Sequence, residues 1–147
     1  MPNQRIIVVT SEIPAEFDYP TAGGGVRAWN LAGGLRGRGF EVVYALSEGV
    51  CKERTFPAEH TRYSWTPQNL TEKLLEATPD VLLFCHWEPM SYLKESPCPV
   101  VLDLPGPLLL ENIFRGVGEI QSQAQTKLRT LSKADAFIIT SRSEEHT

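Results

Sequence analysis

The chain has 147 residues, of which 41% are hydrophobic and 22% are charged, and its 14 Lys+Arg against 18 Asp+Glu give a formal net charge of −4. This composition is that of one globular domain, and it excludes collagen, coiled coils and disordered tails. The acidic balance and the lack of a Lys/Arg-rich run argue against a nucleic-acid-binding surface. The apolar stretches are far shorter than the ~20 residues that a membrane-spanning helix needs, so we expect any membrane contact to be at most peripheral.

The three cysteines, Cys51, Cys85 and Cys98, form no Cys-x-x-Cys pair and have no histidine at metal-ligand spacing. This pattern favours reduced thiols in a cytoplasmic protein and predicts no metal site. The first residues lead into an apolar strand without the charged segment and apolar core of a secretory signal.

The first half of the chain predicts a strand, a long loop, a helix and a second strand. Residues 6–9 are a β-branched run typical of a strand buried on both faces. A loop with two prolines follows and leads to three glycines at 23–25. Apolar residues then recur at helical spacing as far as Leu35, and the glycines at 37 and 39 end the helix. Residues 42–46 predict the second strand.

The second half predicts further alternation of strands and helices. We expect a loop over 49–60, a weak strand over 62–65 and a helix that begins at Thr66-Pro67 and ends before Pro79. The remaining expected elements are strands at 81–85, 100–102 and 136–139 and one long helix over 113–131. Such alternation indicates an α/β fold with a Rossmann-like, doubly wound parallel sheet, in which ligands bind at the carboxyl ends of the strands.

The segment Gly23-Gly24-Gly25-Val26-Arg27-Ala28 matches the sequence pattern G-x-G-x-x-G/A of dinucleotide-binding loops. In those loops the glycines follow the strand at once, whereas here about a dozen residues intervene. Three interpretations stay open: a nicotinamide or flavin site, glycines that only permit a turn, and an anion-binding loop at a helix start with Arg27 as phosphate partner.

Several segments together resemble the N-terminal domain of the family 4 glycosyltransferases, which have the two-domain GT-B fold. The matching segments, in chain order, are Arg5–Val9, Gly23-Gly24-Gly25-x-Arg27, Asn30-Leu31-Ala32 with Leu35, Arg38–Val43, Pro79-Asp80-Val81, His86-x-Glu88-Pro89, Pro99-Val100-Val101 and Lys133–Ala136. Phe40 stands where a histidine is common in that family. The family's histidine in the loop after the 100–102 strand is also missing, because that loop is Asp103-Leu104-Pro105-Gly106-Pro107.

The resemblance implies a retaining, metal-independent enzyme that transfers a sugar from a nucleoside-diphosphate sugar to a carbohydrate or lipid-linked acceptor, without a further cofactor. Residues 1–141 would form the acceptor-side, N-terminal half, which we expect to be incomplete, and the donor would bind mainly a C-terminal domain that this chain lacks. The residues at 142–147 are typical of a translated sequencing adaptor, so we expect a non-native tail there. The isolated fragment is then expected to be inactive.

The resemblance and the residue types together give the candidate site residues. Gly23, Gly24, Gly25 and Arg27 would lie near the donor phosphates, and His86 and Glu88 would hold an acceptor hydroxyl. Asp103 is the candidate general base, with capping of the next turn as the alternative role. A structural role is also open for His86. Glu111 is expected near the start of a helix, where the helix dipole favours a negative charge. A non-catalytic nucleotide- or phosphate-binding module and an NAD-dependent oxidoreductase fragment remain as alternative functions.

Overall fold

The computed structural model describes residues 3–104 and 108–139 of the chain. The loop residues 105–107, the expected domain end at 141 and the expected tail at 142–147 lie outside the described residues. The strands are β1 (Arg5–Thr10), β2 (Glu41–Leu46), β3 (Val81–Phe84), β4 (Val100–Leu104) and β5 (Ala136–Ile139). The helices are the 3-10 turn η1 (Ala15–Phe17), α1 (Gly23–Arg36), α2 (Glu48–Glu53), α3 (Ala58–Thr61), α4 (Leu70–Glu76), α5 (Trp87–Met90), α6 (Leu108–Arg115) and α7 (Ile120–Leu131).

The five described strands form one parallel sheet in the order β2-β1-β3-β4-β5. From β1 the chain moves outward to β2, and it then crosses back over β1 to continue through β3, β4 and β5. The direction of winding therefore reverses between β1 and β3. This topology confirms the predicted Rossmann-like, doubly wound α/β fold, and it places the switch point, where such sheets bind ligands, between β1 and β3.

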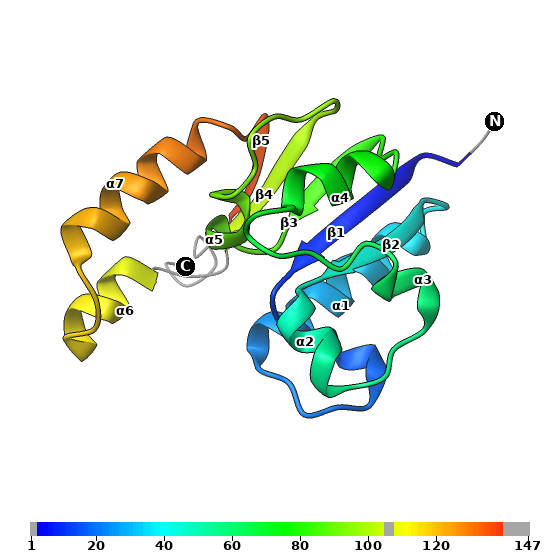
Figure 1. Ribbon diagram of the computed structural model, residues 1–147, viewed down its shortest axis with the longest axis horizontal. Helices are drawn as coiled ribbons and strands as arrows, with labels where there is room; N and C mark the ends of the chain where they lie inside the picture. Colours follow the sequence, from blue (N-terminus) through cyan, green and yellow to red (C-terminus); the bar gives the residue numbers. More distant parts are fainter. Residues whose placement is uncertain (1–2, 105–107, 140–147) are drawn as a thin grey trace, which may run out of the picture.

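Helices cover both faces of the sheet, as Figure 1 shows. The helix α1 packs on one face through Ala32 and Leu35, against a layer that includes Val8 and Tyr44. The helices α4 and α5 pack on the other face, where Leu74 and Met90 belong to the layer built on Ile7, Val9, Leu82, Phe84 and Leu102. Strands β1 to β3 are buried on both faces, which explains their near-continuous apolar sequences.

The expected loop over 49–60 and weak strand over 62–65 differ from the structure. Two short helices, α2 and α3, occupy most of the first segment, and only an isolated bridge between Ser47 and Trp65 stands in place of the strand. The backbone nitrogen of Trp65 donates to Leu46 O, and its indole nitrogen donates to Ala45 O at 2.9 Å. Trp65 is thus held beside β2 by a few hydrogen bonds and not by strand pairing. The alternation of residues in the sequence does not distinguish these two arrangements.

Two helix boundaries also differ from the expectation. The long helix predicted over 113–131 is two helices, α6 and α7, because Gly116 and Gly118 adopt positive φ angles of 63° and 74° and so break the helical path. The helix α4 begins at Leu70 instead of near Thr66, and the side chain of Asn69 accepts a hydrogen bond from the Thr66 nitrogen at 2.7 Å.

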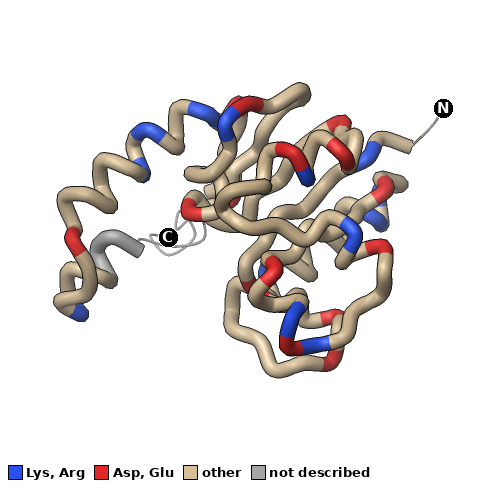
Figure 2. The backbone as a smooth tube through the Cα atoms, viewed as in Figure 1, with Lys and Arg blue, Asp and Glu red and all other residues tan. Residues whose placement is uncertain are grey.

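Figure 2 shows Lys and Arg interspersed with Asp and Glu along the chain. Among residues 3–104 and 108–139, the helices are all too short or too polar to cross a bilayer. The three cysteines are free.

Candidate functional site

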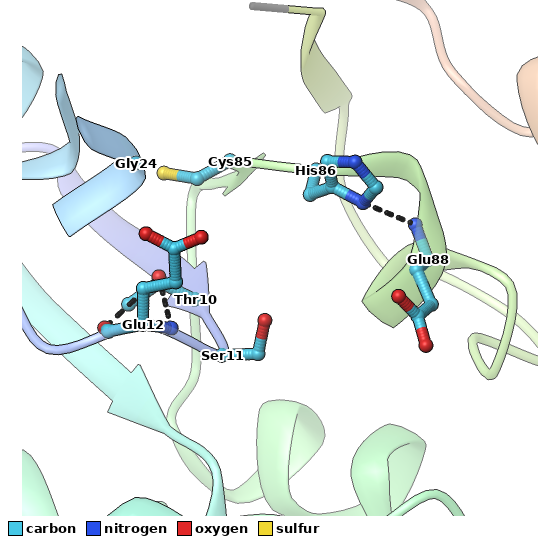
Figure 3. Close-up of a pocket in the computed structure, with 7 residues that line it drawn as sticks. All are labelled: Thr10, Ser11, Glu12, Gly24, Cys85, His86 and Glu88. Atoms are coloured by element: carbon cyan, nitrogen blue, oxygen red, sulfur yellow. Dashed lines mark hydrogen bonds between the residues drawn. The ribbon is translucent and has the colours of Figure 1, made fainter. Parts of the chain in front are cut away.

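A cleft of about 250 Å3 lies at the carboxyl ends of β1 and β3, at the switch point of the sheet. Its lining comes from the end of β1, the start of α1 and the segment that leads from β3 into α5 (Figure 3): Thr10, Ser11, Glu12, Gly24, Cys85, His86 and Glu88. Three residues that the sequence singled out, Gly24, His86 and Glu88, are thereby brought to one place. In open parallel sheets this is the position at which ligands bind.

The helix α1 begins at Gly23 without a side-chain cap, because Ala22 at the N-cap position has no polar side-chain atom. The positive end of the helix dipole lies at this helix start, and Gly24 of its first turn lines the cleft. The carboxylate of Glu12 lies directly against Gly24, so that a β-carbon at Gly24 would collide with it. Figure 3 shows this carboxylate pointing toward Gly24 and Cys85. The place that an anionic ligand would take at the helix start thus holds a carboxylate of the chain itself.

The three glycines have different surroundings. A β-carbon at Gly23 would point into open space, whereas one at Gly25 would collide with the Ile13 carbonyl oxygen and the Thr21 hydroxyl. These two atoms are hydrogen-bonded to each other and close the β1–α1 loop over the helix start. Gly25 is buried, so its lack of a side chain is required by packing of that loop.

Arg27 and Asp103 form an ion pair that joins α1 to the end of β4. Arg27 Nε donates to Asp103 Oδ2 at 2.5 Å, and Arg27 Nη2 donates to Asp103 Oδ1 at 2.7 Å. The Asp103 side chain is fully buried, whereas 31% of the Arg27 side chain is exposed. The hydrogen bond with Asp103 raises the pKa of Arg27. Neither residue is among the residues that line the cleft. Their expected roles as phosphate partner and general base stay predictions.

His86 has a defined hydrogen-bonding arrangement at the start of α5. Its Nδ1 accepts a hydrogen bond from the backbone nitrogen of Glu88 at 3.1 Å, which caps the short helix. Burial lowers the pKa of His86, and the carboxylates of Glu88 and Glu12 oppose this shift in part. The neutral ring must then carry its proton on Nε2, because Nδ1 is the acceptor. At pH 7 His86 therefore offers an N–H donor.

Four residues of the cleft were not singled out as site residues by sequence reasoning: Thr10, Ser11, Glu12 and Cys85. Thr10 is buried, and its hydroxyl bonds the backbone of Glu12 at 3.0 and 3.2 Å, which turns the chain away from β1. Burial raises the pKa of Cys85 to about 12, so the thiol stays protonated at neutral pH. The signal that could have found these residues is their position at strand ends next to the switch point.

The charge of the cleft is negative. Two carboxylates, Glu12 and Glu88, belong to the lining, which includes no lysine or arginine among residues 3–104 and 108–139. Within the described part of the chain there is also no cluster of three or more His, Cys, Asp or Glu side chains suited to a metal ion. Carboxylates accept hydrogen bonds and repel phosphates, and the His86 N–H donates. This set of groups suits hydroxyl-bearing ligands.

Comparisons of the chain with protein-family models, with curated proteins and with solved structures found no match.

Proposed function

We propose that the chain is the acceptor-binding, Rossmann-like half of a glycosyltransferase that transfers a sugar from a nucleoside-diphosphate sugar to an acceptor hydroxyl. The observation that carries the proposal is the convergence of Gly24, His86 and Glu88 on one cleft at the switch point. These residues come from distant segments that the family resemblance had selected. The donor nucleotide would bind a second Rossmann-like unit, which the resemblance implies.

The chemistry of the cleft supports the acceptor role more than the donor role. A sugar hydroxyl both donates and accepts, so it can accept from the His86 N–H and donate to the carboxylate of Glu12 or Glu88. A pyrophosphate would meet two carboxylates there, and the guanidinium of Arg27 is already paired with Asp103. Binding of donor phosphates near Gly24 would therefore require the Glu12 side chain to move aside.

Asp103 acts in this proposal through Arg27. The buried carboxylate fixes the guanidinium against the end of β4, and this ion pair holds the start of α1 at the edge of the cleft. A fully buried, doubly hydrogen-bonded carboxylate is poorly placed to take a proton from a bound hydroxyl. The exposed carboxylates of Glu12 and Glu88 are the better candidates to orient that hydroxyl.

A phosphate- or nucleotide-binding module is the second candidate, favoured by the uncapped, glycine-rich start of α1. The negative charge of the cleft argues against this candidate, because it repels phosphates. A nicotinamide site is disfavoured by connectivity, because β1 ends at Thr10 and α1 begins only at Gly23, whereas the dinucleotide fingerprint needs a tight strand-to-helix turn.

The proposal is tested by applying the purified chain to an array of neutral oligosaccharides and glycolipid headgroups. We expect retention of a subset of glycans and its loss in Glu88→Gln. The matched control is Glu72→Gln, an exposed glutamate on α4 outside the cleft, which should bind as the unaltered chain does. Absence of any retained glycan, or retention that Glu88→Gln leaves unchanged, would overturn the proposal.

A further inference from the structure

A second cavity, of about 310 Å3, lies between α5, α6 and α7 and adjoins the cleft. Its lining residues are Trp87, Glu88, Ser91, Tyr92, Asn112, Ser122, Gln123 and Thr126. Glu88 lines both the cleft and this cavity, so one extended ligand could contact it from either side. The size falls within the roughly 300–1,000 Å3 typical of small-molecule sites.

Among the described residues that line the cavity, Glu88 alone is charged, and the others are polar or aromatic. Apart from Glu88, the lining offers hydroxyl groups, two amides and two aromatic rings. Tyr92 is 37% exposed and supplies an aromatic surface, whereas Trp87 is 7% exposed and largely buried in the core. Hydroxyls and amides both donate and accept hydrogen bonds, as sugar hydroxyls do. The described part of this lining offers an anionic ligand no lysine or arginine to balance its charge.

The two amides are held in fixed positions. Asn112 Nδ2 donates to Gln123 Oε1 at 2.9 Å, which joins α6 to α7. The Gln123 amide nitrogen also packs closely against Gly118, where the chain turns between the two helices with a φ of 74°. Asn112 Oδ1 and Gln123 Nε2 make no other hydrogen bond among the described residues, so one acceptor and one donor group stay available.

Trp87 adds a second, independent observation. Its indole nitrogen is a buried donor without a hydrogen-bond partner among the described residues. Buried donors are normally satisfied by protein, by water or by a ligand. Trp87 lines the cavity, but its indole nitrogen has less than 1 Å² of exposed surface, so the ring must move before a ligand hydroxyl in the cavity can accept from it.

We propose that this cavity binds a second sugar unit of the acceptor, so that the acceptor is a neutral oligosaccharide whose reacting unit lies in the cleft. The inference rests on the proposed function for the role of the cleft. The ligand class follows from the hydroxyl and amide groups of the described lining, which include the hydrogen-bonded pair Asn112 and Gln123. The shared Glu88 is the point at which the two units meet.

The test is a titration of the whole chain monitored by two-dimensional 15N–1H NMR. The Trp87 indole and Gln123 side-chain amide signals report on the cavity, and the Gly24 amide and His86 ring signals report on the cleft. The Trp87 signal is assigned with Trp87→Phe. The probes are the disaccharides maltose, cellobiose and lactose, the monosaccharides methyl α-glucopyranoside and methyl β-galactopyranoside, and glucose 6-phosphate as an anionic probe.

At least one disaccharide is expected to shift both sets of signals, and the monosaccharides to shift the cleft signals alone. Glucose 6-phosphate should shift neither set. Gln123→Ala should weaken disaccharide binding about tenfold, the usual effect of losing one ligand hydrogen bond, without altering the monosaccharide shifts. The matched control is Gln125→Ala, an exposed glutamine on the same helix outside the cavity, which should leave both unchanged.

The outcomes separate this inference from the proposed function. Shifts of the cleft signals alone with every disaccharide would overturn the inference and leave the proposed function standing. Shifts of the cavity signals alone would overturn the acceptor role of the cleft and keep the cavity as a sugar site. No shift of either set would overturn both.

Discussion

Arg27 in the first turns of α1 and Asp103 near the end of β4 are joined by two hydrogen bonds, at 2.5 and 2.7 Å, across the sheet face that α1 covers. The sequence predicts ligand-binding or catalytic roles for both residues, and the structure shows that they bind each other. This ion pair also explains how the start of α1 is fixed beside a cleft whose described lining includes no arginine or lysine.

Arg27→Ala should destabilise the fold, because it leaves the buried Asp103 carboxylate without its partner. Breaking a buried pair costs about 3–5 kcal/mol, and the partial exposure of Arg27 lowers the expected loss of unfolding free energy to about 2–3 kcal/mol. The double variant Arg27→Met/Asp103→Leu should lose less unfolding free energy than Arg27→Ala alone, because it leaves no unpaired buried charge. Urea denaturation measures both values.

The control for this prediction is Arg38→Ala, an exposed residue after α1 that makes no ion pair within the described residues. It should change the unfolding free energy by less than about 0.5 kcal/mol. A stable Arg27→Ala variant that has instead lost nucleoside-diphosphate binding would favour the phosphate-partner role over the structural one.

Alanine substitution of the three glycines should give three different results. Gly25→Ala should lower the unfolding free energy by about 1–3 kcal/mol, because its β-carbon collides with Ile13 and Thr21. Gly24→Ala meets only the movable end of Glu12 and should have a smaller effect on stability. Gly23→Ala opens onto free space and serves as the control, with a change of less than about 1 kcal/mol. Thermal melts of the three variants check the order, and equal losses would contradict it.

The glycines illustrate how far sequence reasoning reaches. Alternating apolar runs and helical periodicity were sufficient to predict the doubly wound sheet, because both patterns reflect burial along each element. The different neighbours of Gly24 and Gly25 could not be predicted, because they depend on how the β1–α1 loop packs against the start of α1. The pairing of Arg27 with Asp103 likewise depends on the packing of α1 against β4, which no local pattern encodes.

The candidate site was partly predictable for the same reason. Gly24, His86 and Glu88 lie next to strand ends, and the parallel sheet brings such ends together. Glu12 and the cavity around Gln123 were missed. The first lies in a loop without a distinctive pattern, and the second exists because Gly116 and Gly118 break a helix that periodicity alone extends.

Stability should fall as the pH is lowered from about 7.5 to about 5.5. His60 is buried beside Tyr44, and its Nδ1 accepts a hydrogen bond from the Tyr44 nitrogen at 3.3 Å. Burial lowers the pKa of His60, with Glu59 and Glu16 opposing the shift and Arg36 adding to it. Below pH ~6.5 the unfolded chain therefore binds a proton that the folded chain resists, and folding loses free energy until the folded pKa is reached.

Melting temperatures across this pH range measure the effect. His60→Asn keeps an acceptor for the Tyr44 nitrogen but removes the titration, so its melting temperature should depend less on pH. His86→Asn removes the second lowered pKa and should reduce the remaining slope. A melting temperature that is constant or rises toward pH 5.5 would contradict this account.

Cys85 should be the least reactive of the three cysteines toward iodoacetamide. Its pKa of about 12 leaves almost no thiolate at neutral pH, whereas burial raises the pKa values of Cys51 and Cys98 less. Time-resolved alkylation with peptide mass spectrometry gives the three rates in one sample. If Cys85 is labelled as fast as the other two cysteines, or faster, the cleft must open to admit the reagent.

We propose that the cleft binds neutral hydroxyl groups and does not bind phosphates. Calorimetric titration of the chain with methyl α-glucopyranoside, methyl α-mannopyranoside, UDP and NAD+, repeated on Glu88→Gln, measures both properties directly. We expect binding of at least one glycoside that Glu88→Gln weakens, together with UDP and NAD+ binding that is weaker or undetectable. Tight binding of UDP or NAD+ with no response to either glycoside would contradict it.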